Sequence, residues 1–557
     1  MRAQGAQGGR DPAQVMRLSR LGSFHQSRLS FMRILTRRMA GEAWWFTRPE
    51  FAVDAGGVGH AIYCAHGPER TYSLVAFSHA LPDEARSDRV IAQAWDATFA
   101  LFDGVPDAAD IDRLRANVPL QEAGRLSARE LSLSRANRSV RLWEHVVARL
   151  ASGAQPDAGE IARVGYLMRT TAVYGSGKMG AADREMIADR PEFAAPFQVE
   201  MLTVYLIRAF LRDLVEHMAR ARGADRAVPL DPAVARRIGI GNSTGLGMAP
   251  FLLNHPQLLN NWIAAREGAL ARVRALPSAS AEELAVFERV LAQSIAMADL
   301  WSTEHAGQAA RVAGLRADLR VLQAHVAAAD LREGHPWERL FVWAEGALGE
   351  EAQECLASLL LEPYGALVDD LAQGMADDSA GFCIDGAMEV QRLRAALRRT
   401  YGWALELDWA DPAQTARAWY VSEAKLEPRL GERAREPIEP YEQPLAPGRD
   451  AARLWQALQG AKGSVAEFLL AHPEHRHMVR RVQICADAPY AEIRGNTIAA
   501  DLMPMDMLRC KLSFFGAVHF DPRSDRWVRI CLFGNAPYPE ELSAENADFW
   551  PYPPVPA

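Results

Sequence analysis

The stretch VGYLMRTTAVYGSGKMG, residues 164–180, decides how this chain is interpreted. A second glycine-rich stretch, RIGIGNSTGLGMAP at residues 237–250, follows after a long helical segment. Both stretches combine glycines with small hydroxyl side chains and a cation. Glycines clustered in this way let a backbone approach a ligand closely, and the exposed N–H groups favour an anion. The two stretches therefore predict a bound anion, and with it an enzyme or a binding protein.

The segment GSGKMG at 175–180 does not fit the P-loop pattern. A P-loop has a glycine five positions before its Gly-Lys pair and Ser or Thr after the lysine. Here Ala172 holds the first position and Met179 follows Lys178, and the sequence before the segment looks helical. Two interpretations remain open. Backbone N–H groups and Lys178 bind a carboxylate or phosphate, or the glycines only break a helix and leave the lysine exposed.

The second stretch has a Gly-x-Gly but lacks the spacing and the preceding strand of a dinucleotide-binding motif. It places Asn242, Ser243 and Thr244 among four glycines, directly before a helical run. Exposed N–H groups at such a junction favour an anion. The alternative is a tight corner where glycine allows two helices to pack closely. We expect the three polar residues to contribute to substrate binding.

Two arginines lie within apolar sequence. The segment MLTVYLIRAFLRDL at 201–214 is apolar on almost every face, which predicts a buried helix carrying Arg208. A buried arginine requires an anionic partner, either a protein carboxylate or a ligand. Arg169 has the same character, and arginine suits bidentate binding of carboxylate or phosphate. We therefore expect Arg169, Lys178 and Arg208 to form a cationic substrate-binding set.

Residues suited to acid–base catalysis are few. Tyr174 and Glu200 are candidates if burial shifts their pKa, and His305 lies among hydroxyl and carboxyl neighbours. His217 and Asp213 are four residues apart, so they are expected to pair on one helix face at the surface. The histidines of HPEHRH at 472–477 lack an HExxH pattern, so no metal site is predicted.

The amino-acid composition limits the classes of protein to which this chain can belong. The 557 residues are 49% hydrophobic and 24% charged, and a net charge of −8 gives no reason to expect a nucleic-acid partner. No apolar run approaches the length of a membrane span. Six scattered cysteines without a CxxC pair predict a reduced, cytoplasmic protein. Heavy use of Ala, Arg, Pro and Gly is typical of a GC-rich bacterial genome.

The N-terminal residues have a charge pattern of their own. The first 41 residues carry eight arginines and one acid, Asp11. One interpretation is a targeting or surface-binding segment, and the other is an ordinary extension with a first helix. We divide the chain into a basic extension (1–42), a small α+β unit (43–125), a helical core (126–426), a Pro-rich linker (427–449) and a C-terminal α+β unit (450–557).

Local patterns predict the individual elements. Residues 60–66 and 71–78 predict a hairpin, and 480–487, 516–521 and 527–533 predict strands. Residues 89–101, 127–153, 156–175, 197–222 and 282–328 predict helices. The fold class expected is mainly α, with smaller α+β units at the two ends.

We expect a cytoplasmic metabolic enzyme that binds a small anionic substrate or cofactor at the glycine-rich turns. Fixed donors with proton transfer would suit a lyase, isomerase or transferase. No nucleotide-binding pattern is evident, so the cofactor stays unknown, as does the oligomeric state. The alternative is a non-enzymatic helical scaffold or ligand-binding protein whose glycines and arginines are structural.

Overall fold

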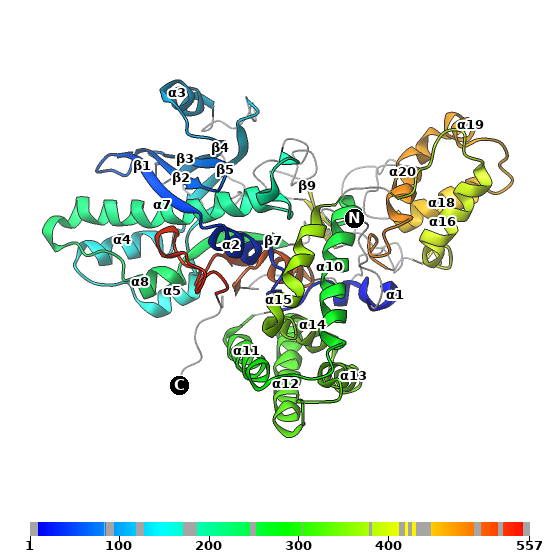
Figure 1. Cartoon of the computed structure of the whole chain (residues 1–557). Coiled ribbons are helices and arrows are strands. Elements are labelled where there is room, and N and C mark those ends of the chain that lie inside the picture. Colours follow the sequence, from blue (N-terminus) through cyan, green and yellow to red (C-terminus); the bar gives the residue numbers. More distant parts are fainter. Residues whose placement is uncertain are drawn as a thin grey trace.

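The centre of the molecule is a mixed β-sheet of nine strands (Figure 1). The computed structural model describes residues 9–82, 84, 94–117, 127–170, 187–245, 252–303, 305–377, 381–411, 418–421, 426–430, 447–494, 503–521 and 527–549. The strand order is β1-β2-β3-β4-β5-β6-β7-β11-β10. The strands are β1 (Trp45–Val53), β2 (Gly59–His66), β3 (Thr71–Ser78), β4 (Ala97–Asp103), β5 (Glu130–Arg138), β6 (Tyr166–Thr170), β7 (Gly239–Gly245), β10 (His519–Asp521) and β11 (Trp527–Leu532).

This sheet shows that the predicted fold class is wrong. A mainly α protein with separate α+β units at its ends would keep the terminal strands apart, whereas β10 and β11 join the sheet of β1–β7 through the β7–β11 ladder. The error arises because pairing between strands almost 300 residues apart leaves no local periodic signal. The helical expectation does hold for the middle of the chain, from α10 (Pro256–Arg274) to α16 (Val390–Leu405).

Several elements differ from their sequence-based predictions. The hairpin at 60–78 is confirmed as β2 and β3, paired antiparallel from Gly59↔Ser78 to His66↔Thr71. The predicted helices at 89–101 and 127–153 instead contain β4 and β5, the latter followed by α4 (Trp143–Ala151). The predicted helix at 156–175 is α5 (Ala158–Val164) followed by β6, because Gly165 ends the helix with φ 77°. The strand predicted at 480–487 is helical, in α20 (Arg476–Cys485).

Helix α7 (Gln198–Gly223) connects the two strands at the middle of the sheet and confirms the predicted buried helix. It extends along the sheet toward the left of Figure 1. Most of its first fourteen residues are buried, which its all-round apolar sequence requires. The short helix α8 (Pro232–Arg237) then leads into β7. Strand β6, helix α7 and strand β7 therefore form a parallel β-α-β unit.

The remaining helices form two groups. One packs below the sheet in Figure 1 and shares its hydrophobic core: α10, α11 (Ala281–Leu300), α12 (Ala306–Ala328), α13 (Pro336–Ala347), α14 (Glu350–Leu359) and α15 (Gly365–Val368). The other is a lobe on the right with a core of its own, made of α16, α18 (Pro447–Ala457), α19 (Val465–Ala471) and α20. The predicted linker at 427–449 lies mainly outside the described residues, although the β8–β9 ladder (Ala418–Val421 with Leu426–Leu430) reaches into it.

Other short elements complete the described fold. They are α1 (Pro12–Val15), α2 (Phe31–Gly41), α3 (Ala108–Asn117) and α21 (Pro504–Cys510), together with one π-helical turn at η9 (Lys511–Phe515). Three short 3₁₀ segments matter below: η6 (Glu362–Tyr364), η7 (Asp369–Ala376) and η10 (Pro539–Glu541). Among the helices described, none is long and apolar enough to cross a membrane.

The basic N-terminal segment runs through the interior of the molecule. Every residue from Arg20 to Thr36 is buried. Arg10 binds the carboxylates of Glu267 and Glu354 through four hydrogen bonds of 2.8–3.0 Å. Further along the segment, Arg20, Arg28 and Arg33 form ion pairs with acids on α14, η6, η7 and the C-terminal residues. These arginines therefore neutralise buried carboxylates from distant parts of the chain.

Candidate functional site

The two glycine-rich stretches continue from neighbouring strands. β6 and β7 pair in parallel, with Tyr166 opposite Gly239 and Arg169 opposite Gly241, and theirs is the one parallel pairing among the described strands. Carboxyl ends of parallel neighbours lie at the same edge of a sheet. Ligands of open sheets with parallel strands bind outside such carboxyl ends. The geometry of β6 and β7 therefore brings the starts of both stretches together.

Gly241 is required by the packing of Arg169. A Cβ atom on Gly241 would lie 2.7 Å from Cγ of Arg169 and 2.5 Å from the ring of Tyr166. Both distances are shorter than carbon–carbon contact allows. The side chain of Arg169 therefore passes over the backbone of β7 at Gly241, level with the carboxyl end of β6 and four residues before the end of β7. The glycine serves close approach between strands here, whereas the sequence predicts either an anion site or a corner between helices.

Asn242 links the two strand ends. Its side chain is fully buried, and its Nδ2 donates a 2.7 Å hydrogen bond to the carbonyl of Thr170, the last residue of β6. The hydroxyl of Thr170 lies 2.8 Å from that of Ser134 on β5. Predicted site residues Arg169 and Asn242 are thus brought to the same strand ends. This fixed arrangement keeps the polar groups in place without a ligand.

A second hydroxyl pair connects this edge with α7. Ser132 lies two residues before Ser134 on β5, so both side chains point to the same face of the sheet. The hydroxyls of Ser132 and Thr203 are 2.8 Å apart, and Thr203 is on the second turn of α7. Glu200 precedes Thr203 by three residues, which places it on the same side of the helix. It is 5% exposed.

The described part of this region is a buried polar cluster, which we call the β6–β7 edge cluster. Its members come from four neighbouring elements and are Ser132, Ser134, Arg169, Thr170, Glu200, Thr203 and Asn242. Six of the seven are buried, and Arg169 is partly exposed. Because Arg169 and Thr170 are adjacent on β6, the arginine and the hydroxyl groups lie on opposite faces of the sheet at the end of that strand. A cation at a strand end suits an anionic ligand, and a buried carboxyl can transfer protons.

Arg208 lies elsewhere. Its guanidinium donates hydrogen bonds to the carbonyls of Ile238, Ala536 and Arg236 at 2.8–3.1 Å, and it lies 3.9 Å from the centre of the Tyr538 ring. Its partners are therefore backbone carbonyls and an aromatic ring, where the sequence predicts a carboxylate or a ligand. Ile238 directly precedes β7, so Arg208 lies at the amino end of this strand, and Ile238 is four residues or about 13 Å from Asn242 at 3.3 Å per residue.

The other predicted residues are placed as follows. Tyr174 and Lys178 lie outside the described residues, so their roles stay predictions. Ser243 and Thr244 are in β7, where they pair with Arg529 and Val528 of β11. His305 caps α12, because its Nδ1 accepts a hydrogen bond from the backbone N–H of Gln308 at 3.3 Å. Arg169 and Asn242 thus lie at neighbouring positions of β6 and β7, and Glu200 is buried on α7, while Arg208 and His305 have local structural partners.

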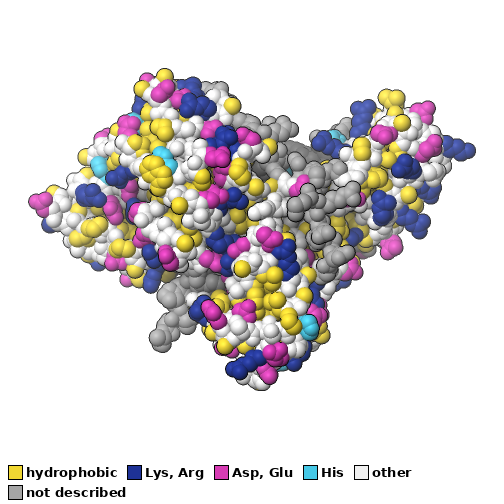
Figure 2. All heavy atoms as spheres, viewed as in Figure 1, with side chains coloured by type: hydrophobic (Ala, Val, Ile, Leu, Met, Phe, Trp, Pro, Cys, Tyr) yellow, Lys and Arg dark blue, Asp and Glu magenta, His cyan; other side chains and the backbone are white. Residues whose placement is uncertain are grey.

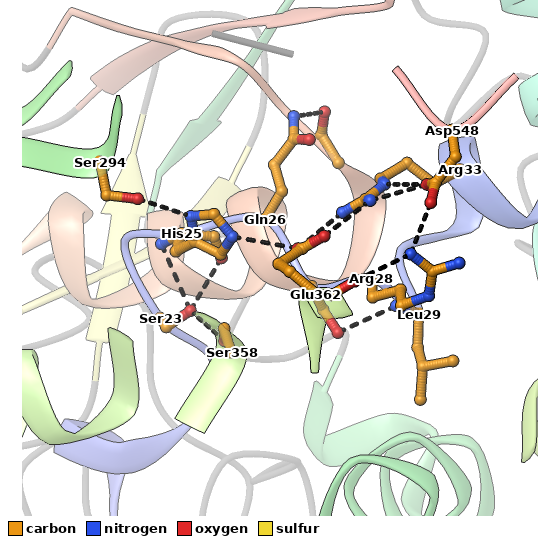
Figure 3. Close-up of polar contacts among 12 residues, drawn as sticks. Ser23, His25, Gln26, Arg28, Leu29, Arg33, Ser294, Ser358, Glu362 and Asp548 are labelled. Atoms are coloured by element: carbon orange, nitrogen blue, oxygen red, sulfur yellow. Dashed lines mark hydrogen bonds and ion pairs between the residues drawn. The ribbon is translucent and has the colours of Figure 1, made fainter. Parts of the chain in front are cut away.

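A different buried network surrounds His25 (Figure 3). Ser294 Oγ lies 3.2 Å from His25 Nδ1, and Glu362 Oε1 lies 3.3 Å from His25 Nε2. The hydroxyl of Ser294, the imidazole of His25 and the carboxylate of Glu362 thus follow the order of nucleophile, base and acid in a catalytic triad. However, both oxygens of Glu362 accept hydrogen bonds from Arg33 at 2.7 and 2.8 Å, and Arg33 also binds Asp548. Burial lowers the pKa of His25, so the ring is neutral.

We therefore assign the network in Figure 3 to the packing of the N-terminal segment. The members are 8% exposed or less, apart from Asp548. Burial opposes ionisation of Glu362, but the charge of Arg33 and the hydrogen bonds from His25 and Arg33 lower its pKa to about 2. The carboxylate is consequently held as an anion whose two oxygens both bind Arg33, as expected for an ion pair that stabilises the packing.

Sequence reasoning missed the hydroxyls on β5 and α7. The segment ELSLS at 130–134 alternates Leu and Ser, which is the period of a half-buried strand. It was interpreted as the start of a helix because Ser127 precedes Glu130 by three residues, as in a capping box. The structure shows that Ser127 Oγ does bond Glu130, at 3.3 Å, but at the start of β5.

Two further observations bound the chemistry. Among the described residues, no group of three or more His, Cys, Asp or Glu side chains has metal-binding geometry. On the face drawn in Figure 2, basic and acidic side chains are interspersed over the described surface.

Comparisons with protein-family models, with curated proteins and with solved structures gave no match.

Proposed function

We propose that this protein is a cytoplasmic metabolic enzyme that binds a small carboxylate or phosphate compound at the β6–β7 edge cluster. One observation carries the proposal: the two glycine-rich sequences contain a pair of adjacent parallel strands, β6 and β7, and continue beyond the carboxyl ends of these strands. Parallel strand ends of this kind are a common place for ligands in sheets with helical connections. The six cysteines are all free thiols, as in proteins of a reducing compartment.

The residues of the cluster have distinct proposed roles. Arg169 binds the anionic group, because its side chain lies over Gly241 at the end of β6 and is partly exposed. The hydrogen bond from the Asn242 side chain to the Thr170 carbonyl fixes β6 against β7 and so orients the bound anionic group. Glu200, buried at the start of α7, transfers the proton. These roles suit a lyase, isomerase or transferase, with Lys178 and Tyr174 as predicted further contributors.

The test is ligand binding measured by thermal shift and calorimetry, with inorganic phosphate and succinate as probes. A ligand that binds only the folded state raises its apparent stability. Arg169→Gln should weaken binding by about tenfold or more, the effect expected for one charge-assisted hydrogen bond. Lys178→Ala should also weaken binding while leaving the melting temperature nearly unchanged.

Arg163→Gln is the matched control, because Arg163 is on α5, before β6, and its side chain is 63% exposed. This variant should bind both probes as the wild type does. If neither probe binds at millimolar concentration, or if Arg169→Gln and Arg163→Gln behave alike, the proposal is wrong.

The second candidate function is a non-enzymatic scaffold. The observation in its favour is that the buried hydroxyls satisfy one another, with Ser132 paired to Thr203 and Ser134 paired to Thr170. In a scaffold, Glu200→Gln would change only stability. In an enzyme, Glu200→Gln would keep ligand affinity within about threefold and abolish turnover, which separates the two functions once a substrate is found.

A further inference from the structure

A cleft opens on the far half of α7, away from the β6–β7 edge cluster. Its volume is about 490 Å³, within the range of small-molecule sites. Strands β1 and β2 form one wall, α7 forms the floor, and η10 forms the other side. The lining residues that matter below are Phe46, Arg48, Phe51, Asp213, Arg220 and Glu540. Asp213 is thirteen residues beyond Glu200, or about 20 Å along the helix.

The floor of the cleft is a fixed polar group. The carboxylate of Asp213 accepts hydrogen bonds from Tyr63 Oη at 2.7 Å, from Arg48 at 2.5 Å and from Arg212 at 3.1 Å. Burial and the charge of Asp213 raise the pKa of Tyr63, so the phenol keeps its proton. With three donors on its oxygens, Asp213 is a support that positions Arg48 and Arg212 and does not itself contact a ligand.

The rim of the cleft carries charges of both signs that retain hydrogen-bonding capacity. The side chains of Arg48 and Arg220 are 49% and 65% exposed, and each forms an ion pair through a single nitrogen, with Asp213 and Glu216, respectively. On the η10 side, Glu540 is 54% exposed and pairs with Arg212 through one oxygen. A guanidinium has five N–H donors and a carboxylate about four acceptor positions, so both can bind a further group.

Part of the wall on the β1 side is apolar. Phe46 and Phe51 are partly exposed on β1 and line the cleft together with Ala209. Phe51 also lies 5.3 Å below the guanidinium of Arg48. A ligand that occupies this space places an apolar or aromatic body against the phenylalanines.

We infer that this cleft is a second binding site, which takes a zwitterionic amino acid with an aromatic or other apolar side chain. The carboxylate of the ligand binds the arginines Arg48 and Arg220. Its ammonium group binds Glu540 on the opposite side. A ligand with one charge alone would contact only one side of the rim, so recognition of both charges sets the specificity.

Three probes on the wild-type protein test this inference by calorimetry: L-phenylalanine, 3-phenylpropanoate, which lacks the ammonium group, and phenethylamine, which lacks the carboxylate. L-Phenylalanine should bind at least tenfold tighter than either of the others. Glycine, which lacks the apolar body, should bind at least tenfold more weakly than L-phenylalanine. Equal affinity for phenylalanine and either half-ligand, or binding of none of them at millimolar concentration, would overturn the inference.

Variants then locate the bound amino acid. Arg48→Gln should remove the preference for phenylalanine over phenethylamine, and Glu540→Gln should remove its preference over 3-phenylpropanoate. Arg222→Gln is the matched control, because Arg222 is on the same helix, 43% exposed and outside the cleft. Circular dichroism confirms that each variant is folded. Binding that is unchanged in both Arg48→Gln and Glu540→Gln shows that the ligand occupies a different site, and overturns the inference.

Discussion

The ammonium nitrogen of Lys511 lies 4.0 Å from the centre of the Phe515 ring, and the lysine is 1% exposed. Both residues belong to the π-helical turn η9, which follows α21. The Phe515 ring in turn packs against Phe197, at the start of α7, with a centroid distance of 4.7 Å. Burial lowers the pKa of Lys511 to about 7, although Cys510 opposes this shift.

The pKa of Lys511 makes stability depend on pH in the neutral to alkaline range. The unfolded chain keeps the proton up to a pKa near 10.5, whereas the folded protein releases it near 7. Between these values the unfolded state binds more protons, so the free energy of unfolding rises with pH, by at most about 1.4 kcal/mol per unit. Urea titrations at intervals from pH 6.5 to 10.5 measure the slope.

Lys511→Met should be more stable than the wild type at pH 7 and should lose this slope. Lys462→Met is the control, because Lys462 is exposed, and it should leave the slope unchanged. A wild-type slope of zero or of the opposite sign would show that Lys511 stays protonated in the folded protein.

Acid should destabilise the protein through two buried carboxylates. The arginine charges that surround them outweigh burial and lower the pKa of Glu354 and of Glu362 to about 2, from 4.5. A lowered pKa contributes stability above pH 4.5 that is lost as the pH falls toward 2. Each group should account for about 3 kcal/mol at 1.36 kcal/mol per unit.

Urea titrations at intervals from pH 5 to pH 2 measure this loss of unfolding free energy. Glu362→Gln should be less stable at pH 5 and should show a shallower decline below it. Glu288→Gln, at an exposed position in the middle of α11, serves as the control for the loss of a carboxylate. Parallel declines for wild type and Glu362→Gln would contradict the assignment.

Arg10→Met should destabilise the protein by about 3 kcal/mol, the lower limit for removing one partner of a buried ion pair. The low value is expected because Arg20 and Arg266 still lie within 3.0 Å of Glu354 and Glu267, respectively. Urea unfolding at pH 7 gives the free energy, with Arg163→Met as the exposed control. A loss below about 0.5 kcal/mol would mean that Arg10 is not part of the folded core.

Gly241→Ala tests the packing at the β6–β7 edge. The new Cβ would overlap the Tyr166 ring and displace Arg169, so we expect a loss of about 1–3 kcal/mol, as for other overpacked sites. Under the proposed function, phosphate or succinate binding should weaken as well. Gly314→Ala is the matched control, because Gly314 is in the middle of α12 with no atom near its added Cβ. It should gain up to about 1 kcal/mol.

Local sequence signals predicted the local structure well where one pattern dominated. The hairpin of β2 and β3 and the buried helix α7 are confirmed, because alternation and all-round apolarity are visible within one segment. Residues 166–170 were misread because YLMRT suits a strand or a helix equally, and only its neighbours β5 and β7 decide for the strand. The sheet itself depends on pairings between distant segments, which no window of sequence contains.

The candidate site was predicted only in part for the same reason. Arg169 and Asn242 were found from their glycine neighbours, and they do meet at one edge. The sequence also indicated that Arg208 is buried, but it could not show that carbonyls from 236–238 and 536–537 surround the guanidinium. Backbone acceptors have no signature in side-chain composition, so a buried arginine was assigned an anionic partner by default.

The buried path of residues 20–36 has a consequence for synthesis. This segment leaves the ribosome early, yet its partners Glu354, Glu362 and Asp548 emerge hundreds of residues later. Growing chains carry arginines and apolar side chains that stay solvated until these later segments have been made, which is the kind of segment that chaperones bind. Residues 20–36 therefore reach their native environment only long after their own synthesis.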